Sequence, residues 1–502
     1  MSRWRYPALA FFTGAAVTIF EFAAPHLFRA YFGQTTYVWA NIIGVILGAL
    51  ALGYAVGGRW ADGTATARPL FAVLLFAGVY GIFVALAGPS IALWLAGSEE
   101  YTQDAALRAF WVQSLAASLI LFGPPLVALG MATPLMVERT SHTWPVGRAS
   151  GLIFGIGTVG SMCGIYLTTY VLLDSLGTRA TIVGAAAALC VVGCIGFFRT
   201  GARAVALMGL LPLGAVPFSV APPWADLPGG KLVYHIESPY QLVRVVDRPP
   251  DEDGVVQRWL AFDEGAGTYH SMALDEELWT GAYYDAFESI PEWLGREKLR
   301  ICILGNAAGT MSELLHAHYS ADDFEIDGVE IDPAVTKAAR EKMGLDEAKH
   351  PRLRIVHADG RTFLASRPEA DYDAIILDAY ARQVSIPASL ATKEFFALVK
   401  SRLRPGGMVF INLGALRPGG RLVHAIADTL AAGFESPVYR APLLHQQNVV
   451  LVAARDGTVP PPPESTRLGV SLSFALHEAG DLVFTDDHCP VERFTAEDLL
   501  LR

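Results

Sequence analysis

Lysine is missing from the first 230 residues, and the first lysine of the chain is Lys231. Long apolar runs fill the same region, and they raise the hydrophobic fraction of the whole chain to 52% and its mean hydropathy to +0.36. Such values exclude an ordinary soluble enzyme over the full length. After Lys231 the composition is that of a soluble, acidic α/β protein, so the 502 residues form more than one domain.

Cysteine is also scarce, and basic residues are outnumbered by acidic ones. The five cysteines have no spacing typical of metal ligands, and Cys190 and Cys194 lie one helical turn apart in an apolar segment, as two buried thiols would. We therefore expect no metal site. The net charge of -11 argues against a nucleic-acid partner and fits a small cationic substrate.

Seven apolar segments before residue 227 approach or exceed the roughly 20 residues that cross a bilayer. They are Pro7–Ala30, Tyr37–Gly57, Pro69–Leu95, Phe110–Val137, Gly151–Leu173, Thr181–Phe198 and Ala202–Val220. The run Gly123-Pro124-Pro125 interrupts the fourth segment, which predicts a kink or a break there. The last segment is short and contains two prolines, so residues 1–226 are expected to form a transmembrane domain of six to seven helices in a lipid bilayer.

The stretch Arg300–Asp332 contains the pattern on which the functional prediction depends. The apolar run Ile301–Leu304 predicts a buried parallel strand, and the turn Gly305–Gly309 leads from it into a short helix. The next predicted strand, Phe324–Ile331, carries Glu330 near its end. Small residues in such a turn let a ligand approach the backbone, and an acid at the following strand end can accept both hydroxyls of a ribose. The pattern predicts an adenosine site at the carboxyl edge of a parallel sheet, although a glycine turn alone can serve geometry only.

The rest of the soluble region predicts two parts. Lys231–Asp247 and Trp259–Phe262 alternate polar and apolar residues, which predicts a small antiparallel β unit over residues 231–290, with a helix at Asp275–Ile290. Residues 291–502 would form a Rossmann-like, methyltransferase-type parallel sheet. Its further strands are predicted at Leu353–Val356, Tyr372–Leu377, Met408–Leu413 and Asn448–Ala453. The expected fold class is a multi-helix α transmembrane domain followed by α/β.

Short blocks of characteristic sequence lie in both regions. In the helical region they are Tyr31-Phe32-Gly33, Tyr37-Val38-Trp39, the run from Leu52 to Asp62, and Leu176-Gly177-Thr178-Arg179. In the soluble region they are Glu237-Ser238-Pro239-Tyr240-Gln241, Gly305 to Thr310, Val329 to Pro333, Asp359-Gly360-Arg361, Ile376-Leu377-Asp378, and Ile386-Pro387 with Leu390, Thr392, Glu394 and Phe395. In order and spacing, these blocks resemble the polyamine aminopropyltransferases (spermidine synthases), and more closely their bacterial membrane-integral branch.

The resemblance implies a multi-pass protein of the bacterial inner (plasma) membrane with a cytoplasmic catalytic domain. Most arginines of the helical region fall on the side of the N-terminus if the helices alternate, and the positive-inside rule places that side in the cytoplasm. Six spans would then leave the soluble region inside, whereas seven would leave it outside. The implied partners are a small cationic polyamine and the lipid bilayer, and a homodimer is compatible with the family.

The resemblance also assigns donor binding to particular positions. The implied set is Gln241, Gly305, Asn306, Glu330, Asp359 and Gly360. Glu330 would hold the ribose hydroxyls, Asp359 would accept a hydrogen bond from the adenine amino group with Gly360 leaving room, and Gln241 would contact the thioether side of the nucleoside. The donor would be decarboxylated S-adenosylmethionine, or S-adenosylmethionine itself, and no metal would take part.

For the second substrate, the resemblance makes Asp378 the catalytic acid that deprotonates or orients the attacking amine. Tyr240 and Tyr283 would line the amine channel, and residues 379–390 would form a loop that closes over the site. Loop closure would exclude water from a reactive sulfonium.

Two positions depart from the pattern of the soluble members. Those enzymes carry an aspartate in the glycine turn that binds the aminopropyl ammonium of the donor, and this chain has Ala307 there. They also carry an acid three residues after the catalytic aspartate, where this chain has Ala381. Asp263 and Glu264 are the predicted replacements that would supply substrate-binding charge, and Asp285 is a further candidate.

Three functions are therefore considered. The leading hypothesis is a membrane-integral enzyme that moves an aminopropyl group from decarboxylated S-adenosylmethionine to a polyamine such as putrescine and releases methylthioadenosine. The second is S-adenosylmethionine-dependent methyl transfer, because Ala307 does not oppose a carboxylate-bearing tail. The third is a polyamine or cation transporter with a nucleoside-sensing domain, for which Glu21 in the first apolar segment would be a candidate cation ligand. Asp378 favours the enzymes.

Overall fold

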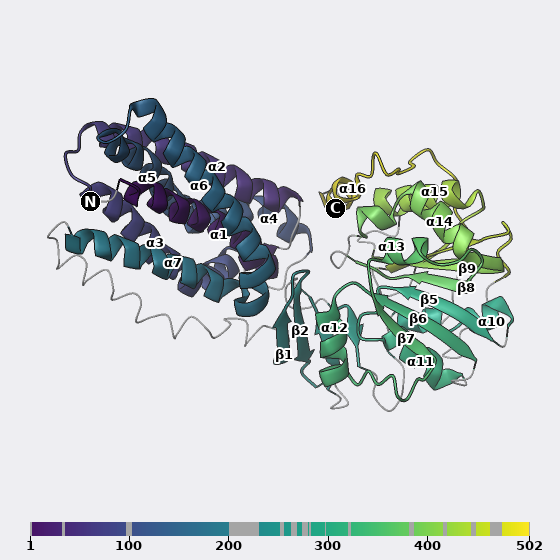
Figure 1. Ribbon diagram of the computed structural model, residues 1–502. Coiled ribbons are helices and arrows are strands. Elements are labelled where there is room, and N and C mark those ends of the chain that lie inside the picture. Colours follow the sequence, from purple (N-terminus) through teal and green to yellow (C-terminus); the bar gives the residue numbers. More distant parts are fainter. Residues whose placement is uncertain are drawn as a thin grey trace. The chain divides into compact units, whose positions relative to one another are not determined.

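The computed structural model consists of two compact units (Figure 1). The helical unit comprises Met1–Ala225 together with Glu237–Gln241, and the α/β unit comprises Asp226–Ile236 together with Leu242–Arg502. The residues that the structure describes are 3–32, 36–96, 103–199, 230–250, 256–262, 269–273, 280, 283–296, 298–319, 323–380, 386–414, 419–442, 448–461 and 474–500.

The helical unit is built from long apolar helices. They are α1 (Arg5–Phe32), α2 (Thr36–Asp62), α3 (Arg68–Ala96), α4 (Gln103–Leu121), α5 (Gly123–Ser141), α6 (Val146–Leu167) with the π-helical turn η1 (Thr168–Leu172), and α7 (Leu173–Arg199). Within the described residues, five stretches are long and apolar enough to cross a membrane, and they lie in α1, α2, α3, α6 with η1, and α7. These five agree with the segments predicted from the apolar runs.

The fourth predicted segment, Phe110–Val137, contains a break. It lies in two helices, α4 and α5, that bend by 48° between Leu121 and Gly123, and counting this pair as one span gives six. The prolines directly after Gly123 explain the break, because proline lacks the N–H that would continue the hydrogen bonds of α4. The predicted segment Ala202–Val220 lies outside the described residues.

Glycines bring three pairs of helices into close contact: α1 with α6, α2 with α5, and α3 with α7. A Cβ atom added to Gly160 of α6 would overlap the carbonyl oxygen of Phe11 in α1. A Cβ added to Gly53 of α2 would overlap the carbonyl oxygen of Val127 in α5, and one added to Gly196 of α7 would overlap a side chain of α3. Gly160 and Gly53 thus allow the backbones of facing helices to pack together, and Gly196 makes room for a side chain of the facing helix.

Replacing Gly160 by leucine should separate α1 from α6 and destabilise the helical unit by about 1–3 kcal/mol or more. The reason is that the backbone atoms of Phe11 cannot move aside as a flexible side chain can. Gly155 lies on the same helix, and an added Cβ there meets no described atom within 4 Å, so Gly155→Leu is the matched control. The measurement is the fraction of protein that stays monodisperse after heating in detergent. Equal losses for the two variants would contradict this account of the packing.

The turn Glu237–Gln241 groups with the helical unit. The Glu237 carboxylate accepts hydrogen bonds from the backbone N–H and the hydroxyl of Thr178, at 3.0 and 2.9 Å, and it lies 3.6 Å from the guanidinium of Arg29. The Arg29 side chain is only 2% exposed, so its charge needs a partner. Two of the characteristic sequence blocks, Leu176–Arg179 and the turn itself, therefore meet at this ion pair.

The α/β unit is built on a sheet of eight strands (Figure 1). In hydrogen-bonding order the strands are β12 (Ala475–Leu476), β10 (Tyr439–Pro442), β11 (Asn448–Ala454), β9 (Leu403–Gly414), β8 (Tyr372–Leu377), β5 (Leu299–Leu304), β6 (Phe324–Glu330) and β7 (Leu353–His357). The strands from β9 to β7 run parallel to one another. Beyond β9 the pairing is antiparallel, between β9 and β11, between β11 and β10, and between β10 and β12. The predicted Rossmann-like sheet is confirmed, whereas β10 and β12 were not predicted.

A smaller antiparallel sheet confirms the predicted β unit. Its strands, in order, are β1 (Lys231–Glu237), β2 (Leu242–Asp247), β3 (Arg258–Ala261) and β4 (Ser271–Met272). The helix predicted at Asp275–Ile290 is wrong as a single element, since the described part contains two short helices, α9 (Tyr284–Phe287) and α10 (Ile290–Leu294). Pro291 stands in the first turn of α10, where a proline starts a helix rather than continues one.

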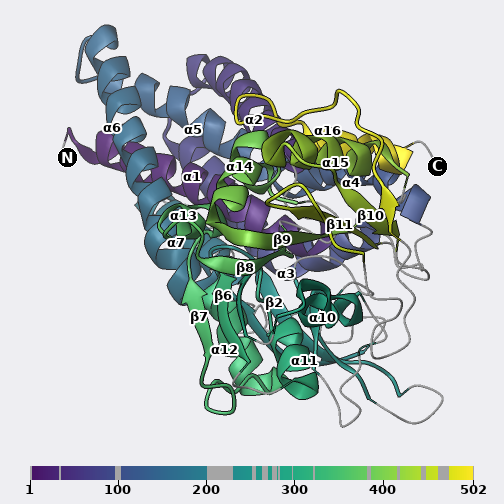
Figure 2. The ribbon, with the colours of Figure 1, turned by 90° about the vertical axis from the view of Figure 1, so that its right-hand side faces the viewer.

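Helices cover both faces of the large sheet (Figure 2). On one face lie α13 (Gly360–Ala365), α14 (Lys393–Arg402) and α15 (Arg421–Phe434), and on the other lie α10, α11 (Thr310–His318) and α12 (Pro333–Ala338). The remaining helical elements are η4 (Ala339–Met343), η5 (Ala388–Leu390) and α16 (Val491–Leu500). Along β5, Cys302 and Leu304 enter one apolar core, and Ile301 and Ile303 enter the other. The strand is a continuous apolar run because both of its faces are buried.

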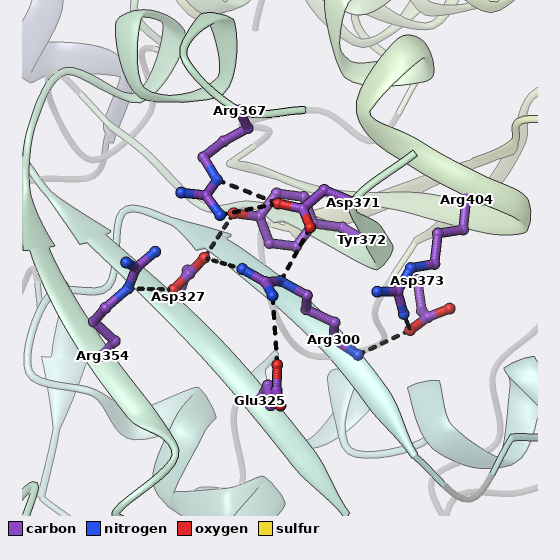
Figure 3. Close-up of polar contacts among 9 residues, drawn as sticks. All are labelled: Arg300, Glu325, Asp327, Arg354, Arg367, Asp371, Tyr372, Asp373 and Arg404. Carbon is purple, nitrogen blue, oxygen red and sulfur yellow. Dashed lines mark hydrogen bonds and ion pairs between the residues drawn. The ribbon is translucent and has the colours of Figure 1, made fainter. Parts of the chain in front are cut away.

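Charged side chains gather toward the amino edge of the sheet, where the parallel strands begin (Figure 3). Asp327 of β6 accepts hydrogen bonds from Arg354 and from the Tyr372 hydroxyl, both at 2.7 Å, and lies 3.5 Å from Arg300. Burial alone would raise the pKa of this carboxyl, but the hydrogen bonds from Arg354 and Tyr372, together with the charges of Arg354 and Arg300, lower the pKa overall. The contacts tie β5, β6, β7 and β8 together at the edge opposite to Glu330.

Replacing Asp327 by alanine should destabilise the α/β unit by about 2–3 kcal/mol, less than for a fully buried pair because Arg354 is half exposed. The lowered pKa means that this stabilisation is present above the unfolded-state pKa of about 4 and is lost as the pH falls, so the deficit should shrink in acid. Glu325 on the same strand is 59% exposed and lies 3.4 Å from Arg300, so Glu325→Ala is the control. The measurement is hydrogen exchange of peptides from β6 and β8. Equal protection in the two variants would refute the stabilising role of Asp327.

Candidate active site

Three positions lie together where parallel strands of the α/β unit end. Asp378 follows β8, Gly305 follows β5, and Glu330 is the last residue of β6. The strand ends are level, because Leu304 of β5 pairs with the last residue of β8 and with Val329 of β6. The Asp378 N–H donates to the Leu304 carbonyl at 2.9 Å, and the Gly305 N–H donates to the Val329 carbonyl at 2.9 Å. This is the carboxyl edge, where open α/β sheets bind their ligands.

The glycine turn takes a conformation that its sequence requires. Gly305 has a φ of +92°, and a Cβ atom there would overlap the Asp378 carbonyl oxygen, so only glycine fits. Ala307 has a φ of +46°, which is uncommon for alanine. Aspartate and asparagine adopt this conformation more readily, so alanine here is a local departure in backbone preference as well as in charge.

The small sheet holds the far end of this turn. The Thr310 hydroxyl at the start of α11 donates to the Met272 carbonyl of β4 at 2.8 Å. The Ser271 hydroxyl oxygen accepts a hydrogen bond from the Ala308 N–H at 3.3 Å. Two groups at the beginning of α11 are thus satisfied by β4, and the turn is fixed between two sheets.

Glu330 is buried and already half satisfied by the backbone. One carboxylate oxygen accepts from the Ala307 N–H and the other from the Asp332 N–H, both at 3.0 Å. Burial raises the pKa of Glu330 to about 7, although these backbone N–H groups act in the opposite direction. A carboxylate can accept about four hydrogen bonds, so two acceptor positions remain for a pair of hydroxyls.

Asn306 lies in the turn, but its side chain packs against Gly328 of β6. It is 5% exposed, and neither its amide nitrogen nor its amide oxygen has a hydrogen-bond partner among the described residues. A buried amide normally bonds to something, so water or a ligand is expected there.

Asp359 and Gly360 lie at the start of α13. Asp359 is exposed, and one of its carboxylate oxygens caps the helix by accepting from the Thr362 N–H at 2.8 Å. A Cβ atom added to Gly360 would lie 3.5 Å from Leu304, an ordinary contact, so packing within the protein does not require glycine. The roles predicted for both residues in adenine binding stay predictions.

Asp378 is held by one donor on each carboxylate oxygen. The Tyr283 hydroxyl donates to one oxygen at 2.8 Å, and the Asn412 amide donates to the other at 2.7 Å. Burial raises the pKa of Asp378 to about 7, although both hydrogen bonds favour the charged form. Burial and the nearby Asp378 also raise the pKa of Tyr283 well above its usual range, so this hydroxyl stays protonated and donates.

Two residues of this network were missed by the sequence analysis. Asn412 of β9 and Tyr380 lie in contact, because the Tyr380 hydroxyl donates to the Asn412 carbonyl at 2.6 Å and accepts from the Gly414 N–H at 2.7 Å. The signal that could have found Asn412 is its position as the one polar residue in the apolar run Met408–Leu413. A polar side chain inside a buried strand needs a partner.

The roles predicted for the other substrate-binding and donor-binding residues stay predictions. Tyr240 and Gln241 lie in the turn of the helical unit, where both backbone N–H groups donate to the Ser238 hydroxyl oxygen, and Tyr240 is 49% exposed. Asp263, Glu264 and Ala381 lie outside the described residues. Asp285 accepts from the backbone N–H and the hydroxyl of Thr280, at 3.1 and 2.6 Å, so its carboxylate has a local structural role.

The arrangement suits proton transfer beside a bound nucleoside. A carboxylate whose pKa lies near neutrality can accept a proton at working pH and release it again. Glu330 offers free acceptor positions one strand away from β5, and Asp378 lies on the other side of β5. Over the described part of the chain, no three His, Cys, Asp or Glu side chains gather to hold a metal ion.

Comparison with known proteins identifies relatives of the α/β unit. Residues 284–430 match the family model described as the spermine/spermidine synthase domain. A probable polyamine aminopropyl transferase of Bifidobacterium longum is 33% identical over 165 residues, which cover 33% of this chain and 35% of that protein. Polyamine aminopropyltransferase 2 of Streptomyces coelicolor is 27% identical over 361 residues, which cover 67% of this chain and 61% of that protein. The chain therefore spans less than two thirds of these two relatives.

A shorter relative is matched over most of its length. The polyamine aminopropyltransferase of a Synechococcus species is 30% identical over 258 residues, which cover 48% of this chain and 79% of that protein. The Streptomyces match is longer than the part of this chain that follows Gly230, so its similarity extends into the helical region. On these matches, the chain belongs to the polyamine aminopropyltransferase family.

Proposed function

We propose that the chain is a membrane-integral aminopropyltransferase that uses decarboxylated S-adenosylmethionine as donor and a small polyamine such as putrescine as acceptor. The observation that carries the proposal is Asp378, a carboxylate at the end of β8 whose pKa lies near neutrality and whose two oxygens are each held by a neutral donor. Glu330, across β5, supports the donor side of the same edge, because its free acceptor positions suit the two hydroxyls of a ribose.

The proposed reaction is a single displacement at carbon. The amine nitrogen forms a bond to the propyl carbon attached to the sulfonium, and the carbon–sulfur bond breaks with its electron pair going to sulfur. Methylthioadenosine leaves as a neutral thioether, so the positive charge moves to the new ammonium. The amine must give up a proton to attack, and Asp378 would bind the protonated amine and accept that proton.

Methyl transfer from S-adenosylmethionine is the second candidate, and Ala307 favours it. The methyl side chain of Ala307 offers no charge to the ammonium of an aminopropyl tail, and it equally offers no repulsion to a carboxylate-bearing tail. Which bond of the sulfonium breaks is therefore the point that the experiment must decide.

The test uses the full chain purified in detergent, with putrescine and each of the two donors, and reads the products by mass spectrometry. Methylthioadenosine together with a polyamine longer by one aminopropyl group is the expected result. S-adenosylhomocysteine with a methylated amine would replace the proposal by methyl transfer. Absence of both products, together with polyamine flux across the membrane of liposomes that contain the protein, would replace the proposal by the transporter hypothesis.

The location in a bacterial inner membrane is part of the proposal. Five described stretches are long and apolar enough to span, and the bent pair of α4 and α5 would make six. An even number of spans puts the N-terminus and the α/β unit on the same side, and the donor is made inside cells. We therefore propose a cytoplasmic catalytic unit.

A further inference from the structure

A second asparagine lies behind the one that holds Asp378. The Asn448 side-chain amide donates to the Asn412 side-chain oxygen at 2.9 Å, and the Asn412 amide in turn donates to Asp378 at 2.7 Å. Asn448 is the first residue of β11, an antiparallel strand beyond the matched residues 284–430. The register of β9 and β11 sets the contact, since Asn448 pairs with Gly414 and Val450 pairs with Asn412.

The chemistry of the groups fixes which way the Asn412 amide points. An ionised carboxylate only accepts hydrogen bonds, so the Asn412 atom that faces Asp378 must be its NH₂ group. The other end of the same amide is then an oxygen, and it needs a donor because Asn412 is 2% exposed. Asn448 supplies that donor. If the donor were lost, the amide could turn over and place its oxygen against the carboxylate.

We propose that Asn448 is a positioning residue for the transfer reaction: it locks the Asn412 amide in the orientation that presents an N–H to Asp378. This inference rests on the proposed role of Asp378. Asn448 itself contacts neither the carboxylate in the described structure nor, in the proposed reaction, either substrate. Its action passes through Asn412, in the way that the third member of a catalytic triad orients the second.

The surroundings of Asp378 make its pKa sensitive to the hydrogen bond from Asn412. The titratable groups beside this carboxyl are the hydroxyls of Tyr283, of Tyr284 in α9 and of Tyr380 after β8. Burial and the nearby Asp378 raise the pKa of all three well above the usual range of tyrosine, so the three hydroxyls stay protonated. No described cation offsets the burial, so the two hydrogen bonds alone support the charged form. Losing the bond from Asn412 should therefore raise the pKa of Asp378 further.

The test is the pH dependence of kcat/KM in the full chain. Asn448→Ala should move the acid limb to higher pH by about one unit, which lowers the rate about tenfold at pH 6 and leaves it near the wild-type value at pH 9. Asn448→Asp keeps the shape of the side chain but cannot donate when ionised, so it should shift the limb at least as far. Asn448→Ser retains a donor, so its acid limb should shift less than that of Asn448→Ala.

A double-mutant cycle separates this route from a general packing effect. Asn412→Ala should produce the shift directly, and adding Asn448→Ala to it should change the profile little, because both act on one hydrogen bond. Asn41→Ala is the matched control, since Asn41 donates to the Ser114 hydroxyl at 2.9 Å within the helical unit. It should leave the profile unchanged.

A readout without turnover keeps this inference separate from the proposed function. Carbodiimide labels protonated carboxyls, and peptide mapping gives the pH midpoint of labelling at Asp378 in each variant. A midpoint that rises in Asn448→Ala supports the inference even if no aminopropyl transfer is found, in which case the proposed function alone fails. An unchanged midpoint, or a rate loss equal at every pH, would overturn the role of Asn448.

Discussion

Asp378→Asn should lower kcat by about 10²- to 10⁴-fold while the affinity for methylthioadenosine changes less than about threefold. The substitution keeps the shape of the side chain, but an amide cannot take a proton from the amine. The amide also has only one acceptor oxygen, so it can accept from either Tyr283 or Asn412 but not from both, and its NH₂ group would face the other donor.

Turnover and nucleoside affinity are measured separately, by product formation and by calorimetry in detergent. Asp346→Asn is the control, because Asp346 lies in a turn after η4, where it accepts a hydrogen bond from the nearby Ala348 N–H and lies 4.0 Å from the Lys349 ammonium. A collapse of nucleoside affinity with turnover preserved at saturation would show that Asp378 binds the donor and is not the base.

Glu330→Gln should weaken methylthioadenosine binding by about 10- to 100-fold, because a charged acceptor of two ribose hydroxyls becomes a neutral amide with a single acceptor atom. The amide oxygen can still serve one of the backbone N–H groups of Ala307 and Asp332, so the turn should keep its fold. The substitution should therefore weaken ligand binding without unfolding the turn.

Binding to the wild-type chain should itself depend on pH. Burial raises the pKa of Glu330 to about 7 in the free protein, so protons compete with the ribose below that pH and affinity should fall by up to about tenfold per unit. Above pH 7 the affinity should be constant, and in Glu330→Gln this dependence should be absent. Glu325→Gln, at the exposed start of β6, is the control, and a pH dependence that survives in Glu330→Gln would assign it to another group.

The parts of the site that the sequence could predict are those that depend on neighbouring residues in the chain. The turn Gly305–Gly309 and the acids Glu330 and Asp378 each lie at the end of a predicted strand, so alternating strands and helices place them at one edge without knowledge of any contact. The long apolar helices were predictable for the same reason. The break at Gly123 followed from adjacent prolines.

The remaining parts depend on contacts between distant segments. Asn412 and Asn448 meet only because β9 and β11 pair in one register, and a shift by one residue would turn the side chains to opposite faces. Glu237 pairs with Arg29 across more than two hundred residues. Asp285 was a candidate for substrate binding because it is an acid in the right region, and its contact with Thr280 is not visible in the sequence.

A structure of the full chain with methylthioadenosine bound would show how the nucleoside lies at the carboxyl edge of the sheet. We expect the ribose hydroxyls on Glu330, the adenine beside Asp359, and the sulfur directed toward Asp378 across the end of β5. A nucleoside bound elsewhere, or one whose sulfur points away from Asp378, would contradict this expectation.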